Sequence, residues 1–165
     1  MLPRKILCPT DFSEPSYAAL DGAITLAQHF GAELCLLHVV PFWPLPSTDP
    51  ILIVDIPLDS ERLNSALTQL CALAASRVPA DVKAHCEVKL GYADKEIACA
   101  IEDGGFDWLI IATHGLSGWR HMVFGSVAES IVRSVKCPVL TIHAPPEAPT
   151  LAELRAVQQE IGVVG

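Results

Sequence analysis

The sequence predicts a doubly wound α/β fold, in which a parallel sheet of five strands is covered by helices on both faces. Short apolar runs of strand length alternate with stretches whose apolar residues recur at helical spacing. The strand-like runs are almost continuously apolar, which is typical of parallel strands buried on both faces. Hydrophobic residues make up 51% of the 165-residue chain and charged residues 18%, so one domain with a sizeable core is expected.

The first two strands flank a helix with clear start and stop signals. The strands are R-K-I-L-C near residues 4–8 and A-E-L-C-L-L-H-V-V over 32–40. Between them, Ser13 is a typical helix-capping residue and Gly31 a typical helix stop. We therefore expect a helix over 14–30.

Residues 41–57 interrupt this alternation, because five prolines surround an apolar I-L-I-V-D-I run. We interpret this segment as an irregular insertion. The next helix begins near residues 59–60. Its expected buried face consists of Leu63, Leu67, Leu70, Ala74 and Val78.

The rest of the domain repeats the same alternation. It contains, in order, a strand near 82–90, a short helix over 94–102, the W-L-I-I-A strand 108–112, a helix from Ser126 and the P-V-L-T-I-H strand 138–143. Ser126 and Glu129 form an S-x-x-E pattern, which predicts a capping box at the start of the last helix. Residues 1–144 thus form one α/β domain, and residues 145–165 a C-terminal tail that we expect to be helical.

Charge and composition exclude several classes of function. The net charge of −8 and the lack of a basic run argue against a nucleic-acid partner. No apolar run is long enough to span a bilayer, and the N-terminus lacks a signal-peptide pattern, so we expect a cytoplasmic protein without a membrane partner. The six cysteines show no metal-ligand spacing and are interpreted as reduced core residues, of which only Cys8 lies beside the expected ligand site.

The loop between the W-L-I-I-A strand and the last helix suits a phosphate. The helix that begins at Gly125-Ser126 offers free backbone N–H groups and the positive end of its dipole, and Gly125 lets a ligand approach the backbone. The loop has no lysine before a Ser or Thr and is therefore not a P-loop. A glycine-containing turn that binds nothing is the alternative interpretation.

Over residues 3–143 the chain resembles the universal stress protein family. The resemblance rests on the opening I-L-C-P-T-D-F-S, on L-L-H-V-V in the second strand, and on a loop similar to the ATP-binding pattern G-x-x-G, nine residues, G-[ST]. Ala112, Gly115, Gly125 and Ser126 occupy the four defined positions. The departure is Ala112, which stands where nucleotide-binding members usually have glycine.

This resemblance implies a strand order of 3-2-1-4-5, a homodimer, and ATP or another adenine nucleotide (AMP or ADP) over strands one and four, with Mg²⁺ or Mn²⁺ as accompanying metal. Asp11 resembles the acidic residue near the ribose and the metal, which it would hold indirectly, and Val39 the residue whose backbone holds adenine. The full set of nucleotide-binding candidates is Pro9, Thr10, Asp11, Val39, Ile111, Ala112, His114, Gly115, Gly125, Ser126 and Val127.

Several candidates also have plain structural explanations. Asp11 could simply organise the turn into the first helix, and His114 could be an ordinary loop residue. Arg120 and His121 are further candidates for contact with phosphates, or they belong to a solvated surface.

The resemblance favours nucleotide binding in a stress-response or signalling module. No catalytic residues are predicted, and turnover would be at most slow ATP hydrolysis or autophosphorylation. The alternative is a dimeric interaction protein of the same fold that does not bind nucleotide. In either case, the edge strand near Val139 to Ile142 is expected to pair with its copy in a homodimer.

Overall fold

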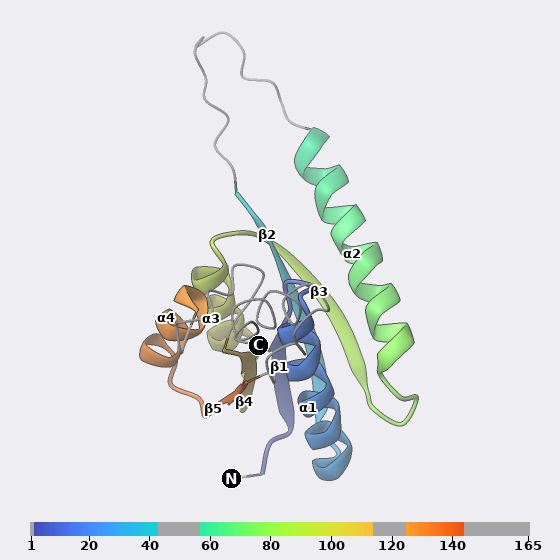
Figure 1. The fold of residues 1–165 in the computed structure, drawn as a ribbon, viewed down its shortest axis with the longest axis vertical. Helices are drawn as coiled ribbons and strands as arrows, with labels where there is room; N and C mark the ends of the chain where they lie inside the picture. The colour runs from blue at the N-terminus through green and yellow to red at the C-terminus, as the bar shows by residue number, and fades with distance from the viewer. Residues whose placement is uncertain (1, 43–56, 114–124, 144–165) are drawn as a thin grey trace, which may run out of the picture.

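The computed structural model describes residues 2–42, 57–113 and 125–143, which form a five-stranded parallel sheet with helices on both faces (Figure 1). The strand order is β3-β2-β1-β4-β5, as expected. The elements are β1 (Lys5–Pro9), α1 (Glu14–Phe30), β2 (Glu33–Pro41), α2 (Pro57–Arg77), β3 (Ala84–Gly91), α3 (Ala93–Gly104), β4 (Trp108–Ala112), α4 (Ser126–Ser134) and β5 (Val139–Ile142). The doubly wound fold is therefore confirmed, and where a bound was predicted the observed one lies within about three residues of it.

The core has one half on each face of the sheet, because successive side chains of a strand point to opposite faces. Along β1, Ile6 and Cys8 pack with α1 and α2, whereas Leu7 packs with α3 and α4. All three are fully buried. Burial on both faces explains why the strands are nearly continuous apolar runs.

Both predicted signals that bound α1 are confirmed. The Ser13 hydroxyl accepts a hydrogen bond from the Ser16 N–H at 3.3 Å, which satisfies one of the free donors at the helix start. At the other end, Gly31 has φ +64°, the left-handed conformation that glycine adopts without steric cost.

The predicted capping box at α4 is wrong. The N-cap residue is Gly125, Ser126 is already the first helical residue, and no side chain caps this helix. A hydroxyl reaches the N–H groups of the first turn from the N-cap position, where the backbone is extended. Ser126 already belongs to the helix, so its hydroxyl does not reach them.

The predicted buried face of α2 is wrong at Leu67, which is 39% exposed, while its neighbour Ala66 is buried. Leu70 is fully buried, and Ala74 and Val78 pack against the core. Ala66, Leu70, Leu73 and Ala74 follow the spacing of one helical face, which leaves Leu67 at the margin of that face. The upper end of α2 extends beyond the body of the sheet (Figure 1).

The assignment of all six cysteines to the core is also wrong. Cys8 and Cys35 are buried, but Cys71 and Cys99 are exposed, and Cys86 and Cys137 are partly buried. Cys71 of α2 and Cys99 of α3 lie on surface helices, where a cysteine can match the spacing of the apolar residues and still be exposed to solvent.

The predicted insertion 41–57 begins and ends in regular elements, because β2 extends to Pro41 and α2 starts at Pro57, where proline suits the first helical position. Residues 43–56 and the predicted helical tail 145–165 lie outside the described residues.

Candidate functional site

A cavity of about 250 Å³ lies at the carboxyl ends of β1, β2 and β4. In an open parallel sheet, ligands usually bind at the carboxyl ends of two adjacent strands whose following connections lead to opposite sides of the sheet. Here that position lies between β1 and β4, because the chain continues from β1 to β2 on one side and from β4 to β5 on the other. Its lining residues are Pro9, Thr10, Asp11, Ser16, Leu37, Val39, Ala93, Ile97, Ile111, Ala112, Thr113, Gly125, Ser126, Val127 and Ala128.

The β1–α1 turn forms one side of the cavity and is held by its own side chains. The Thr10 hydroxyl lies 2.8 Å from the Ser16 hydroxyl and accepts the Phe12 N–H at 3.1 Å. Phe12 has φ +63°, an unfavourable conformation for a bulky residue, and its ring packs 4.4 Å from that of His38. These contacts offset the strain and fix the backbone that carries Thr10 and Asp11.

Asp11 both organises this turn and faces the cavity. Its Oδ1 atom accepts hydrogen bonds from the Ser13 N–H, at 3.1 Å, and from the Ser13 hydroxyl. These hydrogen bonds organise the turn into α1, which is the structural role considered for Asp11. Asp11 also lines the cavity. The two interpretations of Asp11 are therefore compatible.

The second strand contributes Leu37 and Val39 to the cavity and fixes the β1 turn from the side. The Thr10 N–H donates to the Leu37 carbonyl at 2.9 Å, and the His38 Nδ1 atom lies 2.8 Å from the Thr10 carbonyl oxygen. These two contacts join the carboxyl ends of β1 and β2.

The start of α4 forms the opposite side of the cavity. The Gly125 N–H donates to the Thr113 carbonyl at 2.7 Å, and the Thr113 N–H donates to the Ile142 carbonyl at 2.9 Å. These bonds attach the helix start to the ends of β4 and β5. The first N–H groups of a helix have no acceptor within it, so those of Ser126, Val127 and Ala128 are donors placed at the cavity wall.

The structure brings nine of the predicted nucleotide-binding residues together around the one cavity: Pro9, Thr10, Asp11, Val39, Ile111, Ala112, Gly125, Ser126 and Val127. The other four candidates, His114, Gly115, Arg120 and His121, lie outside the described residues.

Sequence reasoning missed six residues of the cavity wall: Ser16, Leu37, Ala93, Ile97, Thr113 and Ala128. Thr113 directly follows Ala112, and Ala128 directly follows Val127. Their positions next to predicted site residues in the sequence could therefore have identified them. Ala93 and Ile97 belong to the first turns of α3, and only the packing of this helix over the sheet brings them to the site.

The cavity wall is mainly apolar and carries little charge. Among the described residues that line it, Asp11 alone is ionisable. No three His, Cys, Asp or Glu side chains of the described segments gather closely enough to hold a metal ion. An apolar wall with a few fixed polar groups is typical of sites for small organic ligands.

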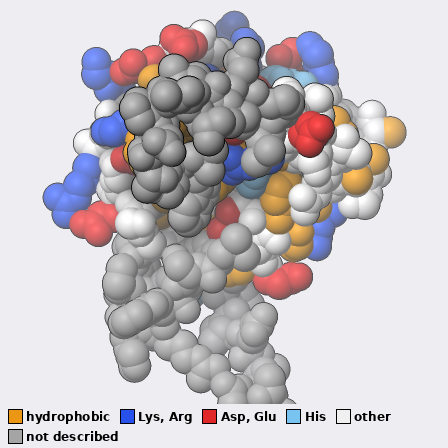
Figure 2. Space-filling model, turned by 90° about the horizontal axis from the view of Figure 1, so that it is seen from above, with side chains coloured by type: hydrophobic (Ala, Val, Ile, Leu, Met, Phe, Trp, Pro, Cys, Tyr) orange, Lys and Arg blue, Asp and Glu red, His pale blue; other side chains and the backbone are white. Residues whose placement is uncertain are grey.

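Charges of both signs are dispersed around the rim of the carboxyl-end face, and hydrophobic side chains gather on one side of it (Figure 2). None of the described helices is long and apolar enough to cross a membrane.

Comparison with known proteins agrees with this architecture. Residues 3–143 match the model of the universal stress protein family. The chain is 33% identical over 145 residues to universal stress protein MJ0531 of Methanocaldococcus jannaschii, an alignment that covers 86% of this chain and 83% of that protein.

Two similar solved structures contain adenine nucleotides. One is a universal stress protein in complex with cAMP, with a TM-score of 0.62, 19% identity and coverage of 87% and 98% of the two chains. The other is a universal stress protein family protein of Arabidopsis thaliana with AMP bound, with a TM-score of 0.58, 18% identity and coverage of 90% and 97%. At this identity the likeness extends to the fold alone. The family match across almost the whole described domain, the strand order and the 33% identical relative show that this chain belongs to the universal stress protein family.

Proposed function

We propose that this protein binds an adenine nucleotide, ATP, ADP or AMP, in the cavity at the carboxyl ends of β1, β2 and β4. One observation carries the proposal: the same cavity combines apolar walls from β2 and α3 with the backbone N–H groups at the N-terminus of α4. A nucleotide has the matching chemistry, with a flat base at one end and anionic phosphates at the other. The complexes of related folds with cAMP and AMP support the same ligand class.

The phosphates would lie against the start of α4. The backbone N–H groups of Ser126 and Val127 supply hydrogen-bond donors, and the helix dipole favours negative charge at that end. Gly115, Arg120, His114 and His121 are proposed to complete the phosphate site from the loop that precedes the helix.

The base would lie at the β2 side, where Val39 offers its backbone and where Leu37 and Ile97 are apolar. Asp11 would stand near the ribose and would help to hold Mg²⁺ or Mn²⁺ indirectly, together with the phosphates. A carboxylate held by Ser13 suits this role because its position is fixed before the ligand arrives.

We expect binding without efficient turnover. Phosphoryl transfer needs a positioned base or water and several groups that neutralise charge. Among the described residues of the cavity wall, only Asp11 is ionisable. A role as a nucleotide-dependent stress or signalling module in the cytoplasm follows as part of the proposal.

The Gly125→Val variant tests the phosphate site. Gly125 has φ −72° and ψ 156°, which any residue adopts, so the variant is expected to fold. The β-branched side chain would occupy the space through which a phosphate approaches the α4 N–H groups. Calorimetric titration with ATP and AMP should therefore detect binding to the parent protein and none to Gly125→Val.

Ser126→Ala is the matched control, because it keeps all backbone N–H groups of α4 and should still bind nucleotide. Circular dichroism should give the same spectrum for all three proteins. If a folded Gly125→Val protein binds ATP like the parent, the phosphates lie elsewhere and the proposed site is wrong.

A further inference from the structure

Two cysteines from different elements lie near one another where α2 packs on the sheet, and neither of them lines the cavity. Cys71 belongs to α2 and Cys86 to β3. The Cys86 Sγ atom donates to the carbonyl oxygen of Leu70, the residue directly before Cys71, at 3.7 Å. Cys71 lies close enough to Cys86 to add to the effect of burial, which raises the pKa of the Cys86 thiol to about 11.

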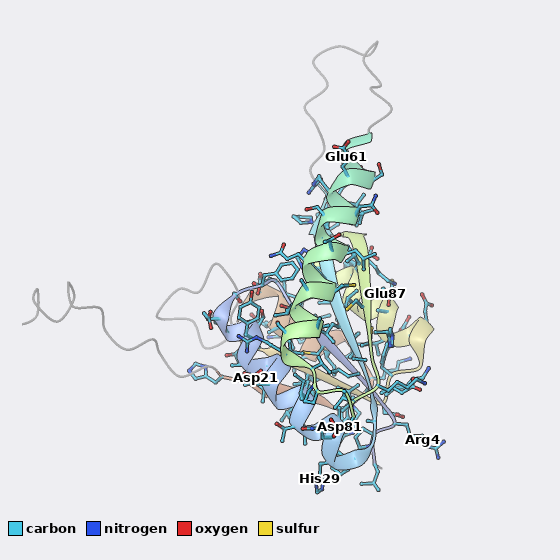
Figure 3. All side chains as sticks on the ribbon, turned by 90° about the vertical axis from the view of Figure 1, so that its right-hand side faces the viewer. Arg4, Asp21, His29, Glu61, Asp81 and Glu87 are labelled. Atoms are coloured by element: carbon cyan, nitrogen blue, oxygen red, sulfur yellow. The ribbon has the colours of Figure 1, made fainter. Side chains whose placement is uncertain are left out.

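Packing of α2 on the sheet produces this pairing. Cys86 and Val88 point to the face of the sheet on which Leu70, Leu73 and Ala74 of α2 pack. Figure 3 shows α2 running along the sheet from the labelled Glu61, with Glu87, the residue after Cys86, beside the middle of the helix. Both cysteines therefore sit on rigid elements that hold them in one arrangement.

Exposure distinguishes Cys71 and Cys86 from the two buried thiols, and the second cysteine beside it distinguishes Cys71 from the exposed Cys99. Cys71 is exposed and Cys86 partly buried, whereas Cys8 and Cys35 are buried. Burial raises the pKa of Cys8 and of Cys35 to about 12, and burial together with the neighbouring Cys71 raises the pKa of Cys86 to about 11, so these three thiols hold little thiolate. Within the pair, oxidants in solvent therefore react first with the exposed Cys71, and Cys86 is the thiol that follows.

We propose that Cys71 and Cys86 form a reversible disulfide when the protein meets a peroxide. The exposed Cys71 thiolate attacks the peroxide, its O–O bond breaks, and Cys71 becomes a sulfenic acid as water leaves. The Cys86 sulfur then attacks the Cys71 sulfur, the S–O bond breaks and a second water leaves. Overall, two thiols and one hydrogen peroxide give one disulfide and two waters, and a thiol reductant reverses the change.

The bridge would fasten α2 to β3, an edge strand of the sheet. It would close a loop over residues 71–86, and cross-links of this length stabilise a fold chiefly by restricting the unfolded chain. Peroxide would thereby stabilise the α2 side of the molecule without touching the nucleotide cavity.

Peptide mapping of the folded, full-length protein tests the proposal. After treatment with hydrogen peroxide, alkylation of the remaining thiols and unfolding, trypsin should release residues 63–77 and 84–89 as one linked peptide. Dithiothreitol should separate them. In thermal unfolding, the oxidised protein should melt higher than the reduced one by roughly 5–10 °C.

Cys71→Ser and Cys86→Ser should each lose the linked peptide and the rise in Tm. Cys99→Ser is the matched control, because Cys99 is an exposed thiol on another helix, and it should keep both. Circular dichroism of the reduced variants checks their fold. The proposal is overturned if the folded parent yields Cys71 and Cys86 only as separate alkylated or singly oxidised peptides, or if Cys86→Ser keeps the rise in Tm.

Discussion

Ser13 and Ser126 both stand at the start of a helix, yet their hydroxyls have different roles. Ser13 is a buried N-cap residue that accepts the Ser16 N–H and donates to Asp11. Ser126 is the exposed first residue of its helix, and its side chain makes no capping hydrogen bond. The contribution of each hydroxyl to stability should therefore differ.

We expect Ser13→Ala to lower the free energy of unfolding by about 1–2 kcal/mol, because it removes a cap and a buried hydrogen-bond donor. Ser126→Ala should change it by less than about 0.5 kcal/mol, as is usual for an exposed residue. Urea unfolding of both variants measures the difference. Equal losses would contradict this assignment of the caps.

We expect Ala112 to limit how tightly the proposed site holds a nucleotide. It is the last residue of β4, its side chain is buried, and it lines the cavity where nucleotide-binding relatives usually have glycine. The methyl group narrows the site without removing any N–H donor of α4. Ala112→Gly should therefore bind ATP several-fold more tightly in a calorimetric titration.

Unchanged or weaker binding by Ala112→Gly would show that the methyl group does not limit affinity. If neither protein binds, the alternative of an interaction protein that has lost its nucleotide is favoured.

At the scale of elements, Asp107 joins the starts of β1 and β4. Its Oδ2 atom accepts the backbone N–H groups of Arg4 at 2.7 Å and Lys5 at 3.0 Å. The Asp107 N–H in turn donates to the Lys5 carbonyl at 2.9 Å. These backbone hydrogen bonds hold the pKa of Asp107 below its ordinary value of 3.8.

A lowered folded-state pKa gives a definite pH dependence. The stabilisation is fully present above the unfolded pKa near 3.8 and is lost as the pH falls through the lower folded pKa. Asp107→Asn keeps an acceptor but no charge, so it should be less stable than the parent at pH 7.

The gap in unfolding free energy between parent and Asp107→Asn should narrow below about pH 4. Urea unfolding at a series of pH values measures this gap. A gap that stays constant down to pH 2 would mean that the Asp107 charge does not contribute.

At the scale of the whole molecule, β5 leaves one edge of the sheet unpaired in the described chain. Leu140 on this strand is 38% exposed and Val132 on the neighbouring α4 is 47% exposed. An exposed edge strand with apolar side chains favours pairing with a second strand. In a two-fold dimer, β5 of each copy would pair with β5 of the other.

We expect light scattering to give twice the chain mass of 17.7 kDa at micromolar concentration. Leu140→Lys should shift the protein to a monomer, because charges would face each other across the two-fold axis. Leu67→Lys changes a similarly exposed leucine on α2 and should leave the dimer intact. A monomeric parent protein, or a dimeric Leu140→Lys variant, would contradict the proposed interface.

The sequence by itself determined the elements and the fold class. Apolar periodicity located every strand and helix of the described domain, with the predicted bounds within about three residues, and Ser13 and Gly31 marked the ends of α1, because these signals act between residues close in the chain. Most of the cavity was also predictable, since parallel strands end at one edge and their loops meet there.

Only the tertiary structure decided which side chains meet across elements. It placed Ala93 and Ile97 of α3 at the cavity, exposed Leu67, and brought Cys86 against the α2 backbone at Leu70, beside Cys71. It also made Gly125 rather than Ser126 the N-cap of α4, because the Gly125 N–H is bonded to Thr113. Local patterns specify the face and the ends of an element, but its tilt and depth over the sheet depend on packing with residues far away in the chain.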